Sequence, residues 1–139
     1  MTDVHSAESR SFNMSRIRSK NTKPEMQVRK ELFARGFRFR LHSKNLPGKP
    51  DIVLKKFKTA IFVNGCFWHG HEECKYFVVP RTRTDWWLQK INRNRQLDKE
   101  NTKKLKNIGW KVIMIYECQL KKEKFEKTMQ TVINKLNIR

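Results

Sequence analysis

The sequence is poor in acidic residues. Only 13 of its 139 residues are Asp or Glu, whereas 32 are Lys or Arg, so the formal net charge is +19 at pH 7. A charge excess of this size favours a polyanion as the partner. A ribosomal-type or chromatin-coating protein is the alternative, but four Trp, nine Phe and long apolar runs predict a folded domain with a core.

Membrane-spanning apolar runs are absent and cysteine is scarce. No run reaches the length that spans a membrane, and the first ten residues lack the basic-then-apolar order of a signal peptide. We therefore expect a cytoplasmic protein without a membrane partner. The three cysteines are an odd number, and a reducing compartment disfavours disulfides. Metal ligation and free thiols are the remaining interpretations.

Hydrophobic periodicity without internal repeats predicts one small α/β domain over residues 22–139. Residues 1–21 are polar and then basic, which predicts an arm that lies on the partner. The first predicted helix begins at a capping box formed by Thr22 and Glu25 and ends at Gly36. Strands are predicted over 37–41, 51–54, 59–63 and 112–116, and the last is expected to be central because its apolar residues do not alternate with polar ones. Two further helices are predicted, one over 85–107 capped by Thr84 and an amphipathic one that contains Phe125 and Leu136.

Cysteine and histidine gather after the second strand of the predicted hairpin. Cys66, His71 and Cys74 share one loop, and Cys118 follows the later apolar strand. Four such ligands suit a closed tetrahedral zinc site. His69 stands at the common two-residue spacing from Cys66 and competes with His71, so spacing leaves the choice of histidine open. The alternative is three buried cysteines and two exposed histidines.

Asp51 follows Pro50 at the start of an apolar strand, as the first carboxylate of metal-dependent nucleases does. The usual second half of that pattern, an acid and a lysine one residue apart on the next strand, is missing because residues 61–65 read IFVNG. One carboxylate, a backbone carbonyl and the phosphate can still hold Mg²⁺, which keeps several waters. His69 can replace the lysine as the group that activates water. For Glu25, helix capping is at least as good an explanation as catalysis.

Aromatic residues form two pairs, Phe67-Trp68 in the cysteine loop and Trp86-Trp87 at the start of the long helix. On a basic protein, exposed rings suit stacking on bases or wedging between them. Core packing is the alternative for each ring, and it suits Phe67-Trp68 least, because Gly, Cys and His flank that pair. Basic side chains of the arm and the long helix would hold phosphates.

Five segments together resemble the very-short-patch repair (Vsr) endonucleases, a bacterial family that nicks DNA at mismatches. The resemblance covers about residues 13–120. It implies a restriction-endonuclease-like fold, with a central mixed sheet flanked by helices and a zinc-stapled loop. The five segments are NMSRIRSKNTKPE, LPGKPDIV, IFVNGCFWHGHEEC, TDWW-x2-KI-x2-N and GWKVIMIYEC.

The resemblance also implies roles for individual residues. Asp51 would bind the catalytic Mg²⁺ together with the backbone carbonyl of Val63. His69 would be the general base, and Glu25 would hold a metal-bound water. The implied ligands of a structural zinc are Cys66, His71, Cys74 and Cys118, and the implied intercalating residues are Phe67, Trp68, Trp87 and Met14.

Two positions depart from the family pattern. Many relatives carry histidine where this chain has Asn64 in the active site. The Asn64 amide can hydrogen-bond a phosphate but cannot take up a proton. Two residues separate His71 from Cys74 where the family usually has one, which changes the shape of the loop and keeps its ligands.

The resemblance implies a Mg²⁺-dependent, strand-specific endonuclease that nicks 5′ of the mispaired T in T·G pairs left by deamination of 5-methylcytosine. We expect a nucleoid-associated monomer, since a mismatch has no two-fold symmetry for a dimer to match, and the mismatch-repair machinery as a further partner. The alternatives are a zinc-stabilised, non-catalytic module that binds distorted DNA, and a double-strand restriction enzyme of the same fold.

Overall fold

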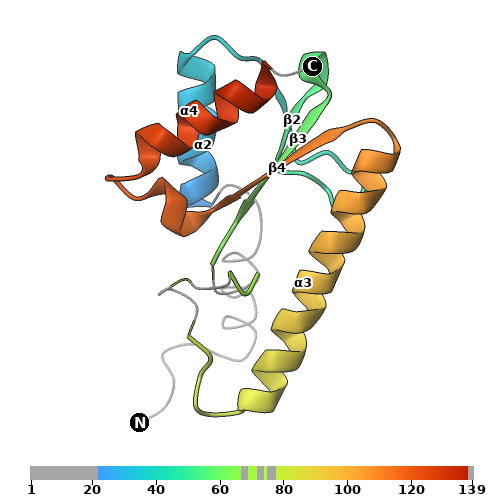
Figure 1. Ribbon diagram of the computed structural model, residues 1–139, viewed down its shortest axis with the longest axis vertical. Helices are drawn as coiled ribbons and strands as arrows, with labels where there is room; N and C mark the ends of the chain where they lie inside the picture. Colours follow the sequence, from blue (N-terminus) through green and yellow to red (C-terminus); the bar gives the residue numbers. More distant parts are fainter. Residues whose placement is uncertain (1–21, 67–68, 72–73, 75–77, 138–139) are drawn as a thin grey trace, which may run out of the picture.

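The computed structural model describes residues 22–66, 69–71, 74 and 78–137. Its centre is a four-stranded mixed sheet in the order β1-β2-β3-β4. Figure 1 labels β2, β3 and β4, with α2 (Lys23–Ala34) and α4 (Phe125–Leu136) on one side of them in that view and α3 (Thr84–Asn107) on the other. β1 pairs with β2 and β2 with β3 in antiparallel fashion, whereas β3 and β4 are parallel. The strands are β1 (Arg40–Leu41), β2 (Ile52–Leu54), β3 (Thr59–Asn64) and β4 (Lys111–Tyr116).

β2 and β3 form the predicted hairpin. A short 3-10 turn, η1 (Lys55–Phe57), connects them, and Lys58 reverses the chain in the left-handed conformation at φ 46°. Every residue of β2 is buried, and so is every residue of β3 except Val63. Burial on both faces explains why neither strand shows the polar alternation of a half-exposed sheet.

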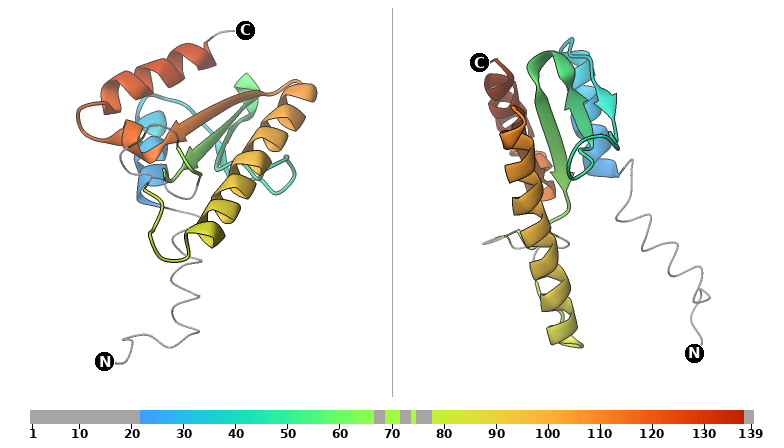
Figure 2. Two further views of the ribbon diagram at one scale, coloured as in Figure 1. Left: turned by 60° about the horizontal axis from the view of Figure 1, so that its bottom comes forward. Right: turned by 90° about the vertical axis from the view of Figure 1, so that its right-hand side faces the viewer.

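Helices cover both faces of the sheet. α2 and α3 lie on opposite sides of it, as the right-hand view of Figure 2 shows. Alternate residues of β3 reach the two sides: Ile61 joins the core that contains α2 and α4, whereas Phe62 packs with α3. Among the described helices, none has the length and apolar character that crossing a membrane requires.

The predicted α/β architecture is confirmed, but three local predictions are wrong. Over 37–41 only the last two residues pair in the sheet. β4 pairs on one side only in the described part of the chain, so this strand lies at an edge, and helices on both faces account for its unbroken apolar run. Thr84 is the first residue of α3 rather than its cap, and its hydroxyl donates to the carbonyls of Pro80 and Arg81.

Four strand ends meet at one end of the sheet. The start of β2 lies beside the end of β1 and toward the end of β3, because β2 is antiparallel to both neighbours. The end of β4 lies beside the end of β3, because those strands are parallel. The residues just outside these ends, His42, Asp51, Cys66 and Cys118, therefore come to the same region.

Candidate active site and metal centre

Two carboxylates and an imidazole lie together at this end of the sheet. Glu25 comes from the first turn of α2, Asp51 directly precedes β2, and His42 directly follows β1. One ligand atom from each lies within 4.8 Å of the others, a spacing that a metal ion can bridge. The backbone N–H of His42 donates to the carbonyl of Asp51 (3.0 Å), so the β1–β2 ladder itself brings these two residues together.

A hydrogen bond from the neighbouring strand β3 holds Asp51 at the end of the sheet. Its Oδ2 accepts a hydrogen bond from the backbone N–H of Val63 (2.8 Å). In an extended strand the N–H and C=O of one residue point to the same side. The Val63 carbonyl therefore points to the side of β3 on which Asp51 lies. Burial raises the pKa of Asp51 from 3.8 to about 6, and the charge of Glu25 adds to the rise. A bound cation would favour the ionised carboxylate.

Glu25 is both part of a helix cap and part of the carboxylate cluster. Its backbone N–H donates to Oγ1 of Thr22, the N-cap of α2 (3.4 Å). Its side chain is only 2% exposed. Oε2 of Glu25 lies 2.8 Å from Nε2 of His42 and 3.1 Å from Nη1 of Arg29. A buried carboxylate needs such donors, and here they also fix its orientation beside Asp51.

His69 pairs with an acid of α3. Its Nδ1 lies 2.7 Å from Oδ2 of Asp98. An ionised Asp98 only accepts hydrogen bonds, so it fixes the proton of His69 on Nδ1 and leaves Nε2 as a base. A positive charge on His69 lowers the pKa of Asp51, which puts the two groups within electrostatic reach of each other.

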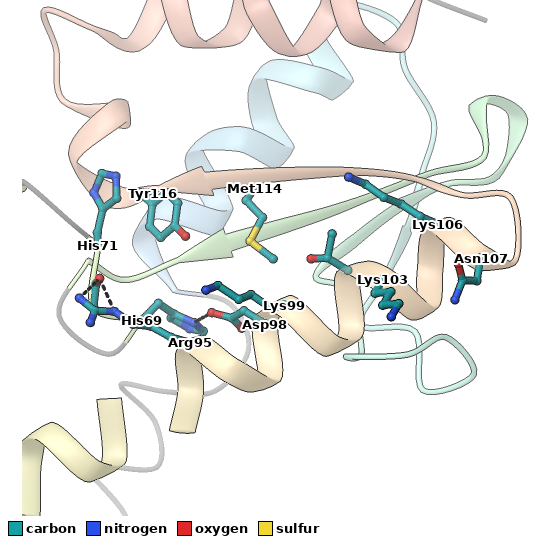
Figure 3. Close-up of a pocket in the computed structure, with 12 residues that line it drawn as sticks. His69, His71, Arg95, Asp98, Lys99, Lys103, Lys106, Asn107, Met114 and Tyr116 are labelled. Carbon is teal, nitrogen blue, oxygen red and sulfur yellow. Dashed lines mark hydrogen bonds and ion pairs between the residues drawn. The ribbon is translucent and has the colours of Figure 1, made fainter. Parts of the chain in front are cut away.

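The His69–Asp98 pair stands at one end of a groove of ≈ 840 Å³ between α3 and β4, as Figure 3 shows. Arg95 closes this end, because its Nε and Nη2 both donate to the carbonyl of Gly70 (2.9 and 2.5 Å). Only glycine suits position 70, since φ is +57° and a Cβ would lie 2.5 Å from Ile91. The basic residues farther along the groove are Lys99, Lys103 and Lys106.

Sulfur and nitrogen atoms form a second cluster. One ligand atom each from Cys66, His71, Cys74 and Cys118 lies within 4.8 Å of the others. The structure thus brings His71 to the cysteines, whereas His69 pairs with α3. Ligands of a tetrahedral zinc ion, at bonds of about 2.0–2.3 Å, lie about 3.3–3.8 Å apart. The 3.4 Å between His71 Nδ1 and Cys118 Sγ falls in this range.

The surroundings of this cluster suit a bound cation. Cys66 is 3% exposed, and burial raises the pKa of its thiol to about 12. Such a thiol stays protonated unless a metal ion binds it as a thiolate. The ring of Tyr116 stacks on His71 with 4.0 Å between centroids and 4° between planes, which fixes the imidazole. Three thiols and one imidazole are a donor set that fits a closed zinc site.

Comparison with known proteins assigns the family. A sequence model described as DNA mismatch endonuclease Vsr matches residues 2–75. Type II nicking enzyme V.NmeAIP of Neisseria meningitidis serogroup A is 51% identical over 121 residues, which are 87% of this chain and 86% of that enzyme. The chain belongs to the Vsr family of DNA mismatch endonucleases.

Two further relatives agree with this assignment. Type II nicking enzyme V.XorIIP of Xanthomonas oryzae pv. oryzae is 47% identical over 120 residues, 86% of this chain and 88% of its own. DNA mismatch endonuclease Vsr of Escherichia coli K12 is 40% identical over 121 residues, 87% and 77% of the two chains. The predicted nuclease activity and restriction-endonuclease-like fold are thereby confirmed, and DNA is the polyanion that the positive charge fits.

Asn64 is one of the two positions at which the resemblance predicts a departure from the family pattern. It is the last residue of β3 and is 5% exposed. Its Nδ2 donates to Sδ of Met114 (3.6 Å), on the side of the sheet that α3 covers. The amide is therefore directed toward the groove of Figure 3 rather than toward Glu25 and His42.

The predicted intercalating residues are only partly described. Phe67, Trp68 and Met14 lie outside the described residues. Trp87 is half-buried in the first turn of α3, and its ring meets that of Trp86 edge-on, with 4.7 Å between centroids.

Trp86, rather than Trp87, is the more exposed ring at the start of α3. Trp86 is 43% exposed. The guanidinium carbon of Arg83 lies 5.0 Å from its ring centroid, and Nζ of Lys90 lies 5.2 Å from it. An exposed ring between two cations is suited to contact both the bases and the phosphates of DNA.

Two residues of the site were missed by sequence reasoning. His42 belongs to a stretch that reads as loop, and only the pairing of Leu41 with Ile52 shows that it stands next to Asp51. Asp98 is one acid among the many charged residues of α3, and its pairing with His69 depends on how the cysteine loop folds onto that helix. A polar residue directly after a predicted strand was the available signal for His42.

Proposed function

We propose that this protein is a Mg²⁺-dependent nickase that cuts one DNA strand 5′ of the mispaired T in a T·G mismatch. The observation that carries the proposal is the placement of the Asp51 carboxylate and the His69–Asp98 pair at one end of the sheet. Phosphodiester hydrolysis needs a cation at the phosphate and a base for the water. Relatives named as mismatch and nicking endonucleases support mismatched DNA as the substrate and a cut in one strand.

Asp51 and the carbonyl of Val63 would hold the Mg²⁺, with its other positions left to phosphate and water. The cation would supply charge neutralisation at the phosphate oxygens. Glu25 would accept a hydrogen bond from a water at this site, since its carboxylate is already oriented by His42 and Arg29.

His69 would take the proton of the attacking water at Nε2, because Asp98 occupies Nδ1. The water would attack the phosphorus in line with the leaving oxygen. Asn64 would donate a hydrogen bond to the phosphate. That role requires its buried amide to give up its contacts with Met114 Sδ, a weak acceptor, and with the Tyr116 side chain.

Recognition of the mismatch would fall to aromatic side chains and the arm over residues 1–21. We assign intercalation to Phe67, Trp68, Trp87 and, from the arm, Met14. The Cys66, His71, Cys74 and Cys118 cluster would bind structural Zn²⁺ and hold the aromatic loop in place. The protein would act as a nucleoid-associated monomer that hands its nick to the mismatch-repair machinery.

Replacing His69 with Ala is expected to slow single-turnover nicking about 10²- to 10⁴-fold, the usual contribution of a general base. Asp98→Asn is expected to cost about 10- to 100-fold, as loss of an orienting partner does. Asp85→Asn, which changes an exposed acid at the start of the same helix, is the control and should nick at the wild-type rate. Wild-type rates for both site variants would exclude this proton pathway.

The Arg83→Gln/Lys90→Gln double variant is expected to weaken the salt dependence of DNA binding. For each phosphate that a cationic side chain no longer neutralises, the slope of log K against log salt becomes shallower by about 0.9. The slope should therefore change by about 1.8 if both residues touch phosphates. Lys122 and Lys127 are exposed near and on α4, and their double Gln variant is the matched control. Equal slopes for the two double variants would argue against DNA binding at the start of α3.

The second candidate function is a zinc-stabilised module that binds mismatched DNA without cutting it. The missing acid-x-lysine pair and Asn64 favour it. Binding and scission are therefore measured together, on T·G and fully matched duplexes, with and without Mg²⁺. Scission of the T strand of the T·G duplex alone supports the nickase. Tight binding without scission in any divalent cation supports the module, and double-strand cleavage of the matched duplex supports a restriction enzyme.

A further inference from the structure

We propose that His42 is a positioning residue, which holds the Glu25 carboxylate toward the cation site at Asp51. The inference rests on the proposed function, because it concerns the same cation. His42 belongs to the cluster of ligand-type side chains within 4.8 Å of one another, and neither the general base nor the Mg²⁺ ligands assigned above include it.

The hydrogen bonds of Glu25 show what His42 adds. An ionised carboxylate only accepts hydrogen bonds, so Nε2–H of His42 donates to Oε2 of Glu25 at 2.8 Å. Arg29 donates to the same oxygen at 3.1 Å, but it lies on the same helix, four residues on. His42 instead ties the carboxylate to the strand pair that carries Asp51.

The backbone of His42 is specialised for this link. Its φ is 48°, in the left-handed region that residues other than glycine seldom adopt, although Asn, Asp and His do so more often than the rest. In this conformation its N–H donates to the carbonyl of Asp51 (3.0 Å) while its ring reaches Glu25. One residue thus contacts both carboxyl-bearing residues of the site, through its main chain and its side chain.

Direct ligation of the cation by His42 is the competing role, and the contacts favour positioning. The ring nitrogen nearest the carboxylates is already engaged with Glu25 Oε2. Mg²⁺ takes oxygen ligands and keeps its waters, whereas imidazole suits the first-row transition metals. An imidazole that orients an acidic neighbour of the cation, as an outer partner does, is consistent with both facts.

The test compares His42→Ala, His42→Gln and the control Lys44→Gln, an exposed change in the same loop. The readout is the Mg²⁺ concentration that gives half-maximal single-turnover nicking of a T·G duplex. Loss of an outer partner raises such a value about 10- to 100-fold, which is expected for His42→Ala. The amide nitrogen of Gln donates a similar hydrogen bond, so His42→Gln should return the value to within about threefold of wild type. Lys44→Gln should leave it unchanged.

Three results would overturn the inference. The first is wild-type Mg²⁺ dependence in a folded His42→Ala protein. The second is an equal loss in His42→Ala and His42→Gln, because a hydrogen bond alone would then not account for the role. The third is a nitrogen signal in the electron spin echo modulation of the Mn²⁺-loaded wild-type protein that is absent from His42→Gln. Such a signal would show that His42 binds the cation directly. If His42→Ala does not fold, the Gln variant and the Mn²⁺ spectrum decide.

Asp51→Asn separates this inference from the proposed function. Nicking at the wild-type rate by Asp51→Asn would refute the proposed cation site, and with it the proposed function. If Asp51→Asn is inactive and His42→Ala has the Mg²⁺ dependence of wild type, only the proposed role of His42 is refuted.

Discussion

Asp51→Asn is expected to lower the single-turnover rate of T·G nicking by about 10³-fold or more. The carboxylate is the negatively charged ligand proposed for the catalytic cation, and charge stabilisation by such a cation contributes several kcal/mol, or about tenfold in rate for each 1.36 kcal/mol. The Asn side chain keeps the shape and can still accept the hydrogen bond from Val63 N–H. The reduced rate would therefore report on the charge and not on a collapsed strand edge.

Binding and rate should separate in that variant. Affinity for the T·G duplex, measured without divalent cation, is expected to stay within about threefold of wild type, because on a protein of net charge +19 most phosphate contacts would be made by other, basic residues. Asp85→Asn, an exposed carboxylate of α3, is the matched control. Undiminished nicking by Asp51→Asn would refute the proposed cation site.

The same substitution should stabilise the protein without Mg²⁺. Asp51 has a folded-state pKa of about 6 against 3.8, so the folded state binds more protons between these values and stability falls as the pH rises through this window. Above it the penalty reaches up to roughly 3 kcal/mol, from about two pKa units. In Mg²⁺-free urea unfolding, Asp51→Asn should be more stable than wild type at about pH 8 and equal to it at about pH 3, below both pKa values. Equal stability at both values would contradict the burial of an unneutralised carboxyl.

Cys118→Ser is expected to cost the protein its zinc and a large part of its stability. Cys118 lies in the short 3-10 turn Glu117–Leu120 that follows β4, whereas the other three donors lie in the loop after β3. One metal ion would therefore join two segments that are at least 44 residues apart in the chain, the distance from Cys74 to Cys118. Structural zinc contributes about 10–16 kcal/mol in small zinc domains, and a domain is stable by only about 5–15 kcal/mol. Thermal unfolding and metal content are the measurements.

The wild-type protein should contain about one equivalent of zinc, and chelation should lower its unfolding temperature. Glu117→Gln is the control, because it changes a neighbouring side chain whose ion pair with Lys121 is long at 3.8 Å and contributes little. A wild-type zinc content below about half an equivalent would count against the four-ligand site. So would a Cys118→Ser protein as stable as Glu117→Gln.

Local signals predicted part of this structure well. The apolar runs over 51–54 and 59–63 and the basic turn between them specify a hairpin, and the hairpin places Asp51 near the end of the next strand. The spacing of Cys66, His71 and Cys74 places three of the four cluster residues in one loop, although the choice between two histidines depended on how the loop packs. Such features depend on short stretches of chain, which is why the sequence carries them.

Features that depend on distant segments were not predictable. An unbroken apolar run has the same appearance in a central strand and in an edge strand that helices cover, so β4 was misplaced. The partners His42–Glu25 and His69–Asp98 lie 17 and 29 residues apart, and polar residues on a loop or a charged helix have no periodicity that marks a partner. Both pairs could be identified only from the three-dimensional structure, in which the strand ends lie together.

The central claim is that the cation at Asp51 and the base at His69 act on one phosphodiester. Phosphorothioate substitution at the scissile linkage tests it most directly, because sulfur binds Mg²⁺ poorly and softer cations better. We predict that one diastereomer is nicked slowly in Mg²⁺, that Mn²⁺ or Cd²⁺ restores its rate in wild type, and that this rescue is absent from Asp51→Asn. Equal rates for both diastereomers in Mg²⁺, with no rescue by softer cations, would contradict it.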